Sequence, residues 1–121
     1  YGEFLGALAG ADLVLDTPWF SGGATSLDAI AIGAPVLAWA SPYARGRQTA
    51  AMLDLCDCPE LIAEDADDYV ARALDLLRDR ERRADLGARL AAAAPRLFDP
   101  GPVVAAFERV LVELAGSDRA D

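Results

Sequence analysis

The stretch "ADLVLDTPWFSGGATSLDAIAIGAPVLAW", residues 11–39, decides the fold. Its segment "DLVLD", residues 12–16, has four to five residues of nearly unbroken apolar character, which is typical of a parallel strand that is covered on both faces. The segment "TSLDAIAIG" has helical spacing, and its last residue, Gly33, is well suited to follow a helix. The segment "PVLAWA", residues 35–40, predicts a second buried strand. A strand, a helix and another strand in this order predict a parallel βαβ unit.

The remainder of the chain continues this alternation. A weak third strand is predicted at residues 59–63, and Gly and Pro residues separate the helices. The spacing of apolar residues predicts further helices at residues 1–10, at 47–56, in two segments of 65–97 (the second at about 82–94) and at about 102–114. We therefore predict an α/β fold in which parallel strands are flanked by helices. Two strong strands make a narrow sheet, so residues 1–121 are interpreted as the C-terminal half of a doubly wound domain. Its missing strands are expected either upstream in a longer protein or in a partner chain.

The composition and charge of the chain exclude several classes of function. The 121 residues include 11 basic and 20 acidic side chains and no histidine, for a formal net charge of −9. Binding to nucleic acid or to an acidic membrane needs basic patches, so neither partner is expected. No run of apolar residues is long enough to predict a membrane span. Without histidine, the chain cannot build a Ser-His or Cys-His nucleophile by itself.

The two cysteines, Cys56 and Cys58, lie in the segment "LCDCPE". Two residues apart, they are poorly placed to pair with each other, and without histidine or further cysteines they fall short of a zinc site. We interpret them as free thiols near a helix end in a reducing compartment, and we expect a cytoplasmic protein. Neither a metal ion nor another cofactor is expected.

The glycine turn, Gly22 and Gly23, follows the first strand at the edge where open α/β sheets bind ligands. Glycines permit positive φ and let a ligand approach the backbone. Thr25 or Ser26 is a good helix N-cap, and free N–H groups in the next turn favour an anion. A structural interpretation remains open, because a glycine pair can simply make a tight turn. Thr25 and Asp28 also resemble a capping box, which is the favoured interpretation of Asp28 on spacing alone.

Several motifs match one glycosyltransferase family in order and spacing. The segments "ADLVLDT" and "SGGATSLDAIAIGAPVLAW" follow the pattern of strand, LDT or LDP, aromatic segment, G-G-T-T-x-x-D-A-L and G-x-P-V. The segments "ARGRQTAAML", "CPELIA", "DDYVARALDL" and "RLFDP" follow in matching order, so the match covers nearly the whole chain. The chain thus resembles the C-terminal donor-binding half of the O-GlcNAc transferase and SPINDLY-like glycosyltransferases, which are associated with tetratricopeptide repeats. This resemblance implies the C-terminal part of a Rossmann-like GT-B domain.

The resemblance also implies a role for each residue of the turn. Gly22 would be the glycine of close approach, and Asp28 would bind the ribose of UDP. Gly23, Ala24 and Thr25 would contact the diphosphate of a UDP-sugar through helix N-terminal amides and the Thr25 hydroxyl. Ala24 departs from the family, which usually has Thr or Ser at this position. The missing hydroxyl contact is worth about 1 kcal/mol if it made a typical hydrogen bond, while the backbone N–H is kept.

Other polar segments have simpler interpretations. Arg47 matches an arginine in the family's loop after the second strand, and we interpret it as structural. The segment "RDRERR", residues 78–83, is interpreted as a solvated helix face or a helix junction, and "DADDY", residues 65–69, as a helix start rather than a metal cluster. Four aromatic residues flank the two strand ends and either line the mouth of a pocket or belong to the core: Trp19, Phe20, Trp39 and Tyr43.

The resemblance implies the donor-binding portion of a glycosyltransferase that moves GlcNAc from UDP-GlcNAc to Ser or Thr hydroxyls of proteins. The catalytic base, the groove for the acceptor protein and the surface that receives the last helix are expected in an N-terminal half outside this chain, so the isolated chain is expected to be inactive. Two alternatives remain: a non-catalytic binding or assembly module with a degenerate glycosyltransferase fold, and a GT-B enzyme with another sugar or acceptor. An exposed parallel sheet edge invites pairing with another chain, which is compatible with a homo-oligomer.

Overall fold

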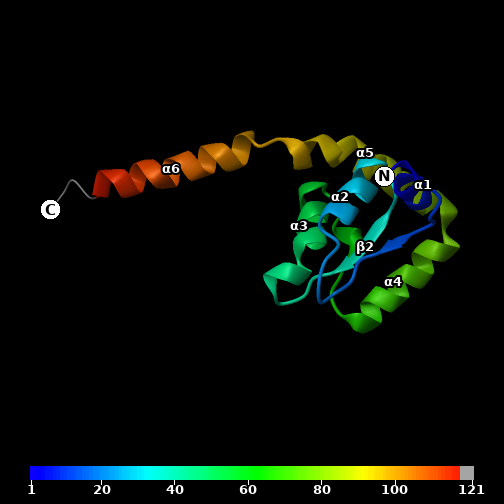
Figure 1. Cartoon of the computed structure of the whole chain (residues 1–121). Coiled ribbons are helices and arrows are strands. Elements are labelled where there is room, and N and C mark those ends of the chain that lie inside the picture. Colours follow the sequence, from blue (N-terminus) through cyan, green and yellow to red (C-terminus); the bar gives the residue numbers. More distant parts are fainter. Residues whose placement is uncertain (118–121) are drawn as a thin grey trace.

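The computed structural model describes residues 1–117 as an α/β domain from which the last helix extends (Figure 1). Its parallel sheet has the order β1-β2-β3, with β1 at Val14–Leu15, β2 at Val36–Trp39 and β3 at Ile62–Ala63. Val14 pairs with Val36, and Ala38 pairs with Ile62. The predicted α/β class with parallel strands is confirmed.

Helices precede, connect and follow the strands. They are α1 (Gly2–Ala9), α2 (Ala24–Ala31), α3 (Gln48–Leu55), α4 (Ala66–Arg78), α5 (Arg80–Ala93) and α6 (Gly101–Ser117), with short 3-10 turns η1 (Ala44–Gly46), η2 (Pro59–Leu61) and η3 (Ala94–Phe98). In Figure 1 the strands run between α4 on one side and the pair α2 and α3 on the other. The predicted helices are confirmed, with ends that shift by a few residues. Asp65 and Asp79 each accept the backbone amide three residues later, which caps α4 and α5.

The core is centred on β2. Val36, Leu37 and Ala38 are at most 1% exposed, because helices cover both faces of this strand. Five of the surrounding elements contribute fully buried side chains: Ile30 from α2, Leu53 from α3, Leu61 from η2, Leu76 from α4, and Leu86 and Leu90 from α5. Burial of such a side chain contributes about 1.5–3 kcal/mol, so these contacts hold the helices on the sheet.

The outer strands are shorter than the sequence predicts. The first predicted strand, residues 12–16, is confirmed only at Val14–Leu15, which pair in parallel with β2. The expectation that both of its faces are covered is wrong, because β1 is an edge strand and Leu15 is 53% exposed. Of the third predicted strand, residues 59–63, only the last two pair with β2. The first three form η2, which Pro59 favours because it has no amide hydrogen for a strand ladder.

Helix α6 extends away from the rest of the domain (Figure 1). The predicted amphipathic helix is confirmed, but its apolar stripe is exposed in the described part of the chain. The members of that stripe, all of them exposed, are Val103, Ala106, Phe107, Val110, Leu111 and Leu114. No helix within residues 1–117 is both long and apolar enough to cross a membrane.

Helices α2 and α5 meet at two glycines. Gly33 follows α2 with φ +74°, which confirms the predicted helix end. A Cβ atom on Gly87 of α5 would lie 2.3 Å from the carbonyl oxygen of Gly33, and one on Gly33 would lie 2.9 Å from the carbonyl oxygen of Gly87. Both distances are too short for a real carbon atom, so this contact between the two backbones requires glycine on both sides.

We predict that Gly87→Ala lowers the free energy of unfolding by about 1–3 kcal/mol, because the new methyl group meets a backbone carbonyl that cannot move aside cheaply. Gly6→Ala is the matched control in a helix. Nothing lies within 4 Å of its added Cβ, so it should stabilise the protein by about 0.5–1 kcal/mol. Urea unfolding of both variants measures the difference, and equal stabilities would contradict the contact.

Candidate functional site

The glycine turn lies at the carboxyl end of β1, directly before α2. Gly23 has φ +49° and is the N-cap of α2, which begins at Ala24. The prediction that Thr25 or Ser26 caps this helix is wrong, because the carbonyl of Gly23 already accepts the amide of Leu27. The positive φ at the cap is readily adopted only by glycine, so the second glycine of the pair sets where the helix starts.

The capping box suggested by the sequence is not formed, and no side chain caps α2. Asp28 instead accepts a hydrogen bond of 2.6 Å from the Tyr1 hydroxyl, and this bond raises the pKa of Tyr1. The Thr25 hydroxyl is exposed and has no hydrogen-bond partner within the part of the chain that the structure describes. The purely structural interpretation of the pair of Thr25 and Asp28 is therefore not supported.

The backbone amides of the turn fall into two groups. The Gly22 amide donates to Asp16 Oδ1 at 2.6 Å and is engaged inside the turn. A Cβ on Gly22 would lie 2.6 Å from Ser26 Oγ, so the close approach at this glycine is made by the protein itself. The amides of Gly23 and Ala24 have no partner among residues 1–117. Free amides at a helix N-terminus carry partial positive charge and attract anions.

A chain of buried hydroxyl groups holds the turn in place. Ser21 Oγ donates to Asp16 Oδ2 at 2.8 Å. Thr49 Oγ1 lies 2.6 Å from Ser21 Oγ and 2.7 Å from Ser26 Oγ. A hydroxyl has one hydrogen, and that of Ser21 is already given to the carboxylate, so Thr49 must donate to Ser21 and Ser26 to Thr49. All of these hydrogen bonds therefore run toward the Asp16 carboxylate, which is 6% exposed.

The same chain fixes α3 beside the turn. The Thr49 amide donates to Ser21 Oγ at 2.9 Å, in addition to the hydroxyl contacts of Thr49. Gln48 Oε1 lies 3.1 Å from where a Cβ on Gly23 would be. Sequence reasoning did not identify Asp16, Ser21 or Thr49 as part of the site. The only feature of the sequence that could have indicated them is that each is a short polar residue next to apolar positions that are buried.

Helix α4 contacts the turn from the other side of β1. The Tyr69 hydroxyl donates to the backbone carbonyl of Asp16 at 2.7 Å. Burial, together with the nearby Asp16 charge, raises the pKa of Tyr69 to about 12. Three helices therefore contact residues 16–22 at the carboxyl edge of the sheet: α2, α3 and α4.

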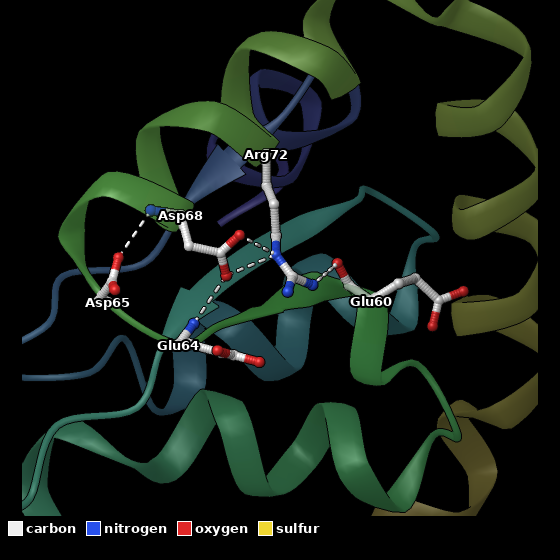
Figure 2. A network of polar contacts seen from close by, with 5 residues as sticks. All are labelled: Glu60, Glu64, Asp65, Asp68 and Arg72. Carbon is white, nitrogen blue, oxygen red and sulfur yellow. Dashed lines mark hydrogen bonds and ion pairs between the residues drawn. The ribbon is translucent and has the colours of Figure 1, made fainter.

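A polar network fixes the start of α4 (Figure 2). Asp65 accepts the Asp68 amide at 2.9 Å, and the Asp68 carboxylate accepts the Glu64 amide at 2.9 Å. Arg72 Nε lies 2.8 Å from both carboxylate oxygens of Asp68 and thereby lowers its pKa, while Arg72 Nη1 donates to the Glu60 carbonyl at 3.0 Å. The predicted helix start at residues 65–69 is confirmed, and the network holds Tyr69 in position.

The aromatic residues of the two loops lie on the surface beside the turn. Trp19, Phe20 and Tyr43 are 63%, 68% and 52% exposed, so they do not belong to the core. Trp19 contacts Trp39 edge to face, with ring centroids 6.3 Å apart. The Arg45 guanidinium lies 4.7 Å from the centre of the Tyr43 ring, and its Nε donates to the Trp19 carbonyl at 3.2 Å. These contacts tie the two loops together.

The basic segment at residues 78–83 is a helix junction, as predicted. Asp79 caps α5, and Arg83 bonds to the last carbonyls of α4 and to Asp12.

Arg47 does not form contacts of this kind with its side chain within residues 1–117. It is exposed at the start of α3, and its side chain has no partner among the described residues, which gives no support to its structural interpretation.

Cys56 and Cys58 are free thiols at the end of α3, as predicted. Both are buried, and burial raises the pKa of each thiol. They therefore stay protonated and unreactive near neutral pH. Within residues 1–117, no group of three or more Cys, Asp or Glu side chains is arranged to hold a metal ion.

Comparisons with known proteins match this arrangement to one family. The model of glycosyl transferase family 41 matches residues 5–100. Among solved structures, an O-GlcNAc transferase mutant from Thermobaculum terrenum matches with a TM-score of 0.81 and 29% sequence identity. The match covers 92% of this chain and 22% of that one, so this chain spans less than a quarter of the similar structure. A search of curated proteins found no match.

We predict that Thr49→Val lowers the free energy of unfolding by about 1–3 kcal/mol, because the buried Ser26 hydroxyl loses its acceptor. Thr25→Val is the matched control, since its hydroxyl is exposed and unpaired among the described residues; its effect should stay within about 0.5 kcal/mol. Urea unfolding compares the two variants. A Thr49→Val protein as stable as the control would contradict the hydroxyl chain.

We also predict that one of the three tyrosines ionises near pH 12 in the native protein. The pKa of Tyr69 is raised above that of an unfolded tyrosine, so its protonated form favours the folded state below about pH 10. That contribution is lost as the pH rises from about 10 to about 12. Absorbance at tyrosinate wavelengths, compared with Tyr69→Phe, measures the late step. A late step that persists in the variant would contradict the assignment.

Proposed function

The chain belongs to glycosyl transferase family 41, and we propose that its glycine turn binds the diphosphate and ribose of a UDP-sugar donor. The observation that carries the proposal is the uncapped N-terminus of α2, whose Gly23 and Ala24 amides have no partner among the described residues. A diphosphate is an anion of suitable size for such a helix end. The Thr25 hydroxyl, exposed in the same first turn, can donate a further hydrogen bond.

The buried hydroxyl chain supports this proposal by holding the donors rigidly. The Asp16 carboxylate accepts a hydrogen bond from the Gly22 amide and so fixes Gly22, and the Ser26 hydroxyl is hydrogen-bonded to the Thr49 hydroxyl. Gly23 and Ala24 lie between these two anchored residues, so little motion is needed to bring their amides onto a phosphate, while the Thr25 amide is already bonded to the Gly22 carbonyl at 2.9 Å. Preorganised dipoles of this kind stabilise developing negative charge more effectively than mobile water.

Asp28 is placed for a different contact. It lies one helical turn after Thr25, and its carboxylate already accepts the hydroxyl of Tyr1. A carboxylate in this position can also accept hydrogen bonds from the hydroxyls of a ribose, with its second oxygen or by exchange with Tyr1. This arrangement supports Asp28 as the ribose contact and adds α1 to the surroundings of the site.

The proposed reaction transfers GlcNAc from UDP-GlcNAc to a Ser or Thr hydroxyl of a protein. As the bond between the sugar and the diphosphate breaks, negative charge grows on the departing UDP, and the α2 amides with the Thr25 hydroxyl would counter it. The acceptor groove and the catalytic base are proposed to lie outside this chain, which spans 22% of the similar structure. The isolated chain would then bind UDP without transferring sugar.

Calorimetric titration of the full-length protein with UDP tests the donor site. Thr25→Val should weaken UDP binding by about five- to tenfold, and Asp28→Asn by about tenfold or more, as expected for one neutral and one charged hydrogen bond. Ala24→Thr should tighten UDP binding by about fivefold if it restores a hydroxyl contact with phosphate. Asp67→Asn, an exposed carboxylate in α4, is the control and should leave binding unchanged.

Two results would oppose the proposal. Absence of UDP binding by the full-length protein would exclude a UDP-sugar donor and favour a binding module that has kept the fold without the chemistry. Binding that is indifferent to Thr25, Ala24 and Asp28 would place the donor elsewhere. Release of UDP from UDP-GlcNAc by the isolated 121 residues would show that the catalytic groups lie within this chain.

A further inference from the structure

We infer that Arg47 contributes a cationic side chain to the donor diphosphate, in addition to the backbone amides of α2. This inference rests on the proposed function of the glycine turn and extends the site to a second helix. It replaces the structural interpretation of Arg47, for which the described residues offer no bonding partner.

The position of Arg47 follows from its neighbours. The next residue, Gln48, places its Oε1 atom 3.1 Å from where a Cβ on Gly23, the N-cap of α2, would be. The residue after that, Thr49, is fully buried and bonded to both Ser21 and Ser26. The backbone that carries Arg47 is therefore fixed beside the turn, and Arg47 lies one residue from a direct contact with it.

The charges of the residues around Arg47 also support this inference. A groove of about 490 Å³ is lined by Pro42, Ala44, Arg47, Gln48 and Ala51, and none of these residues is acidic. The chain has 20 acidic residues, and other arginines find partners among them: Arg72 bonds to Asp68, and Arg96 to Asp57. Among residues 1–117, no carboxylate forms an ion pair with Arg47, so its positive charge in this groove is not neutralised there.

The neighbouring arginine provides a contrast. Arg45 belongs to the same loop, but its guanidinium rests on the Tyr43 ring and bonds to the Trp19 carbonyl. Arg45 is thus used to join the two loops, whereas the side-chain donors of Arg47 have no acceptor in the described part of the chain. A guanidinium binds phosphate through two parallel hydrogen bonds and stays charged at any physiological pH, so it suits a diphosphate better than an ammonium group.

Titration of the full-length protein with UDP and with uridine tests the inference. Arg47→Ala should weaken UDP binding at least tenfold while uridine binding stays unchanged, because only UDP carries phosphate. Arg47→Lys should fall between the wild type and the alanine variant. The UDP affinity of Arg47→Ala should also depend less on salt concentration than that of the wild type. Arg80→Ala, an exposed arginine at the start of α5, is the control and should behave as the wild type.

The outcomes separate this inference from the proposed function. If the wild type binds no UDP, the donor proposal and this inference fail together. If the wild type binds UDP and Arg47→Ala binds it equally well, Arg47 has no role at the phosphates while the donor proposal stands. If Arg47→Ala loses UDP and uridine binding together and melts at a lower temperature, the role of Arg47 is structural and the inference is overturned.

Discussion

The buried carboxylate of Asp16 is the constraint on which the carboxyl edge of this sheet depends. An isolated buried charge is costly, so it must be surrounded by hydrogen-bond donors. Here the donors are the Ser21 hydroxyl and the Gly22 amide, and the hydroxyls of Thr49 and Ser26 are aligned behind Ser21. Hydrogen bonds in such a chain polarise one another, which strengthens the whole set. One carboxylate thereby determines the relative positions of β1, α2 and α3.

This organisation also explains how an acidic residue can lie so close to a site proposed for an anion. The donors around Asp16 face inward, toward its own carboxylate, and are used up there. The amides of Gly23 and Ala24 belong to the other side of the turn and have no partner among the described residues. The turn therefore separates one negative charge, already satisfied by the protein, from a place where a second can be bound.

The sequence predicted local features better than features that depend on distant residues. Helical spacing located the helices, and the apolar run of β2 located the central strand, because both patterns are set by near neighbours along the chain. The start of α2 was placed at Thr25 or Ser26 because these are common caps, whereas the actual cap, Gly23, is selected by a positive φ. The hydroxyl chain could not be predicted, because it joins residues 28 positions apart. The order of the motifs was sufficient to predict the family, but not to separate Gly22, engaged within the turn, from Gly23 and Ala24.

The contact between Gly33 and Gly87 has a mechanical meaning for the opposite end of α2. The backbone that follows the C-terminal end of α2 packs directly against the backbone of α5. The N-terminal end of α2 is held by the hydroxyl chain through Ser26. A helix restrained at both ends cannot slide along its axis when a ligand presses on its first turn. The stiffness that α5 confers should therefore keep the entropic cost of capturing a ligand low, because little of the protein has to be ordered at the moment of binding.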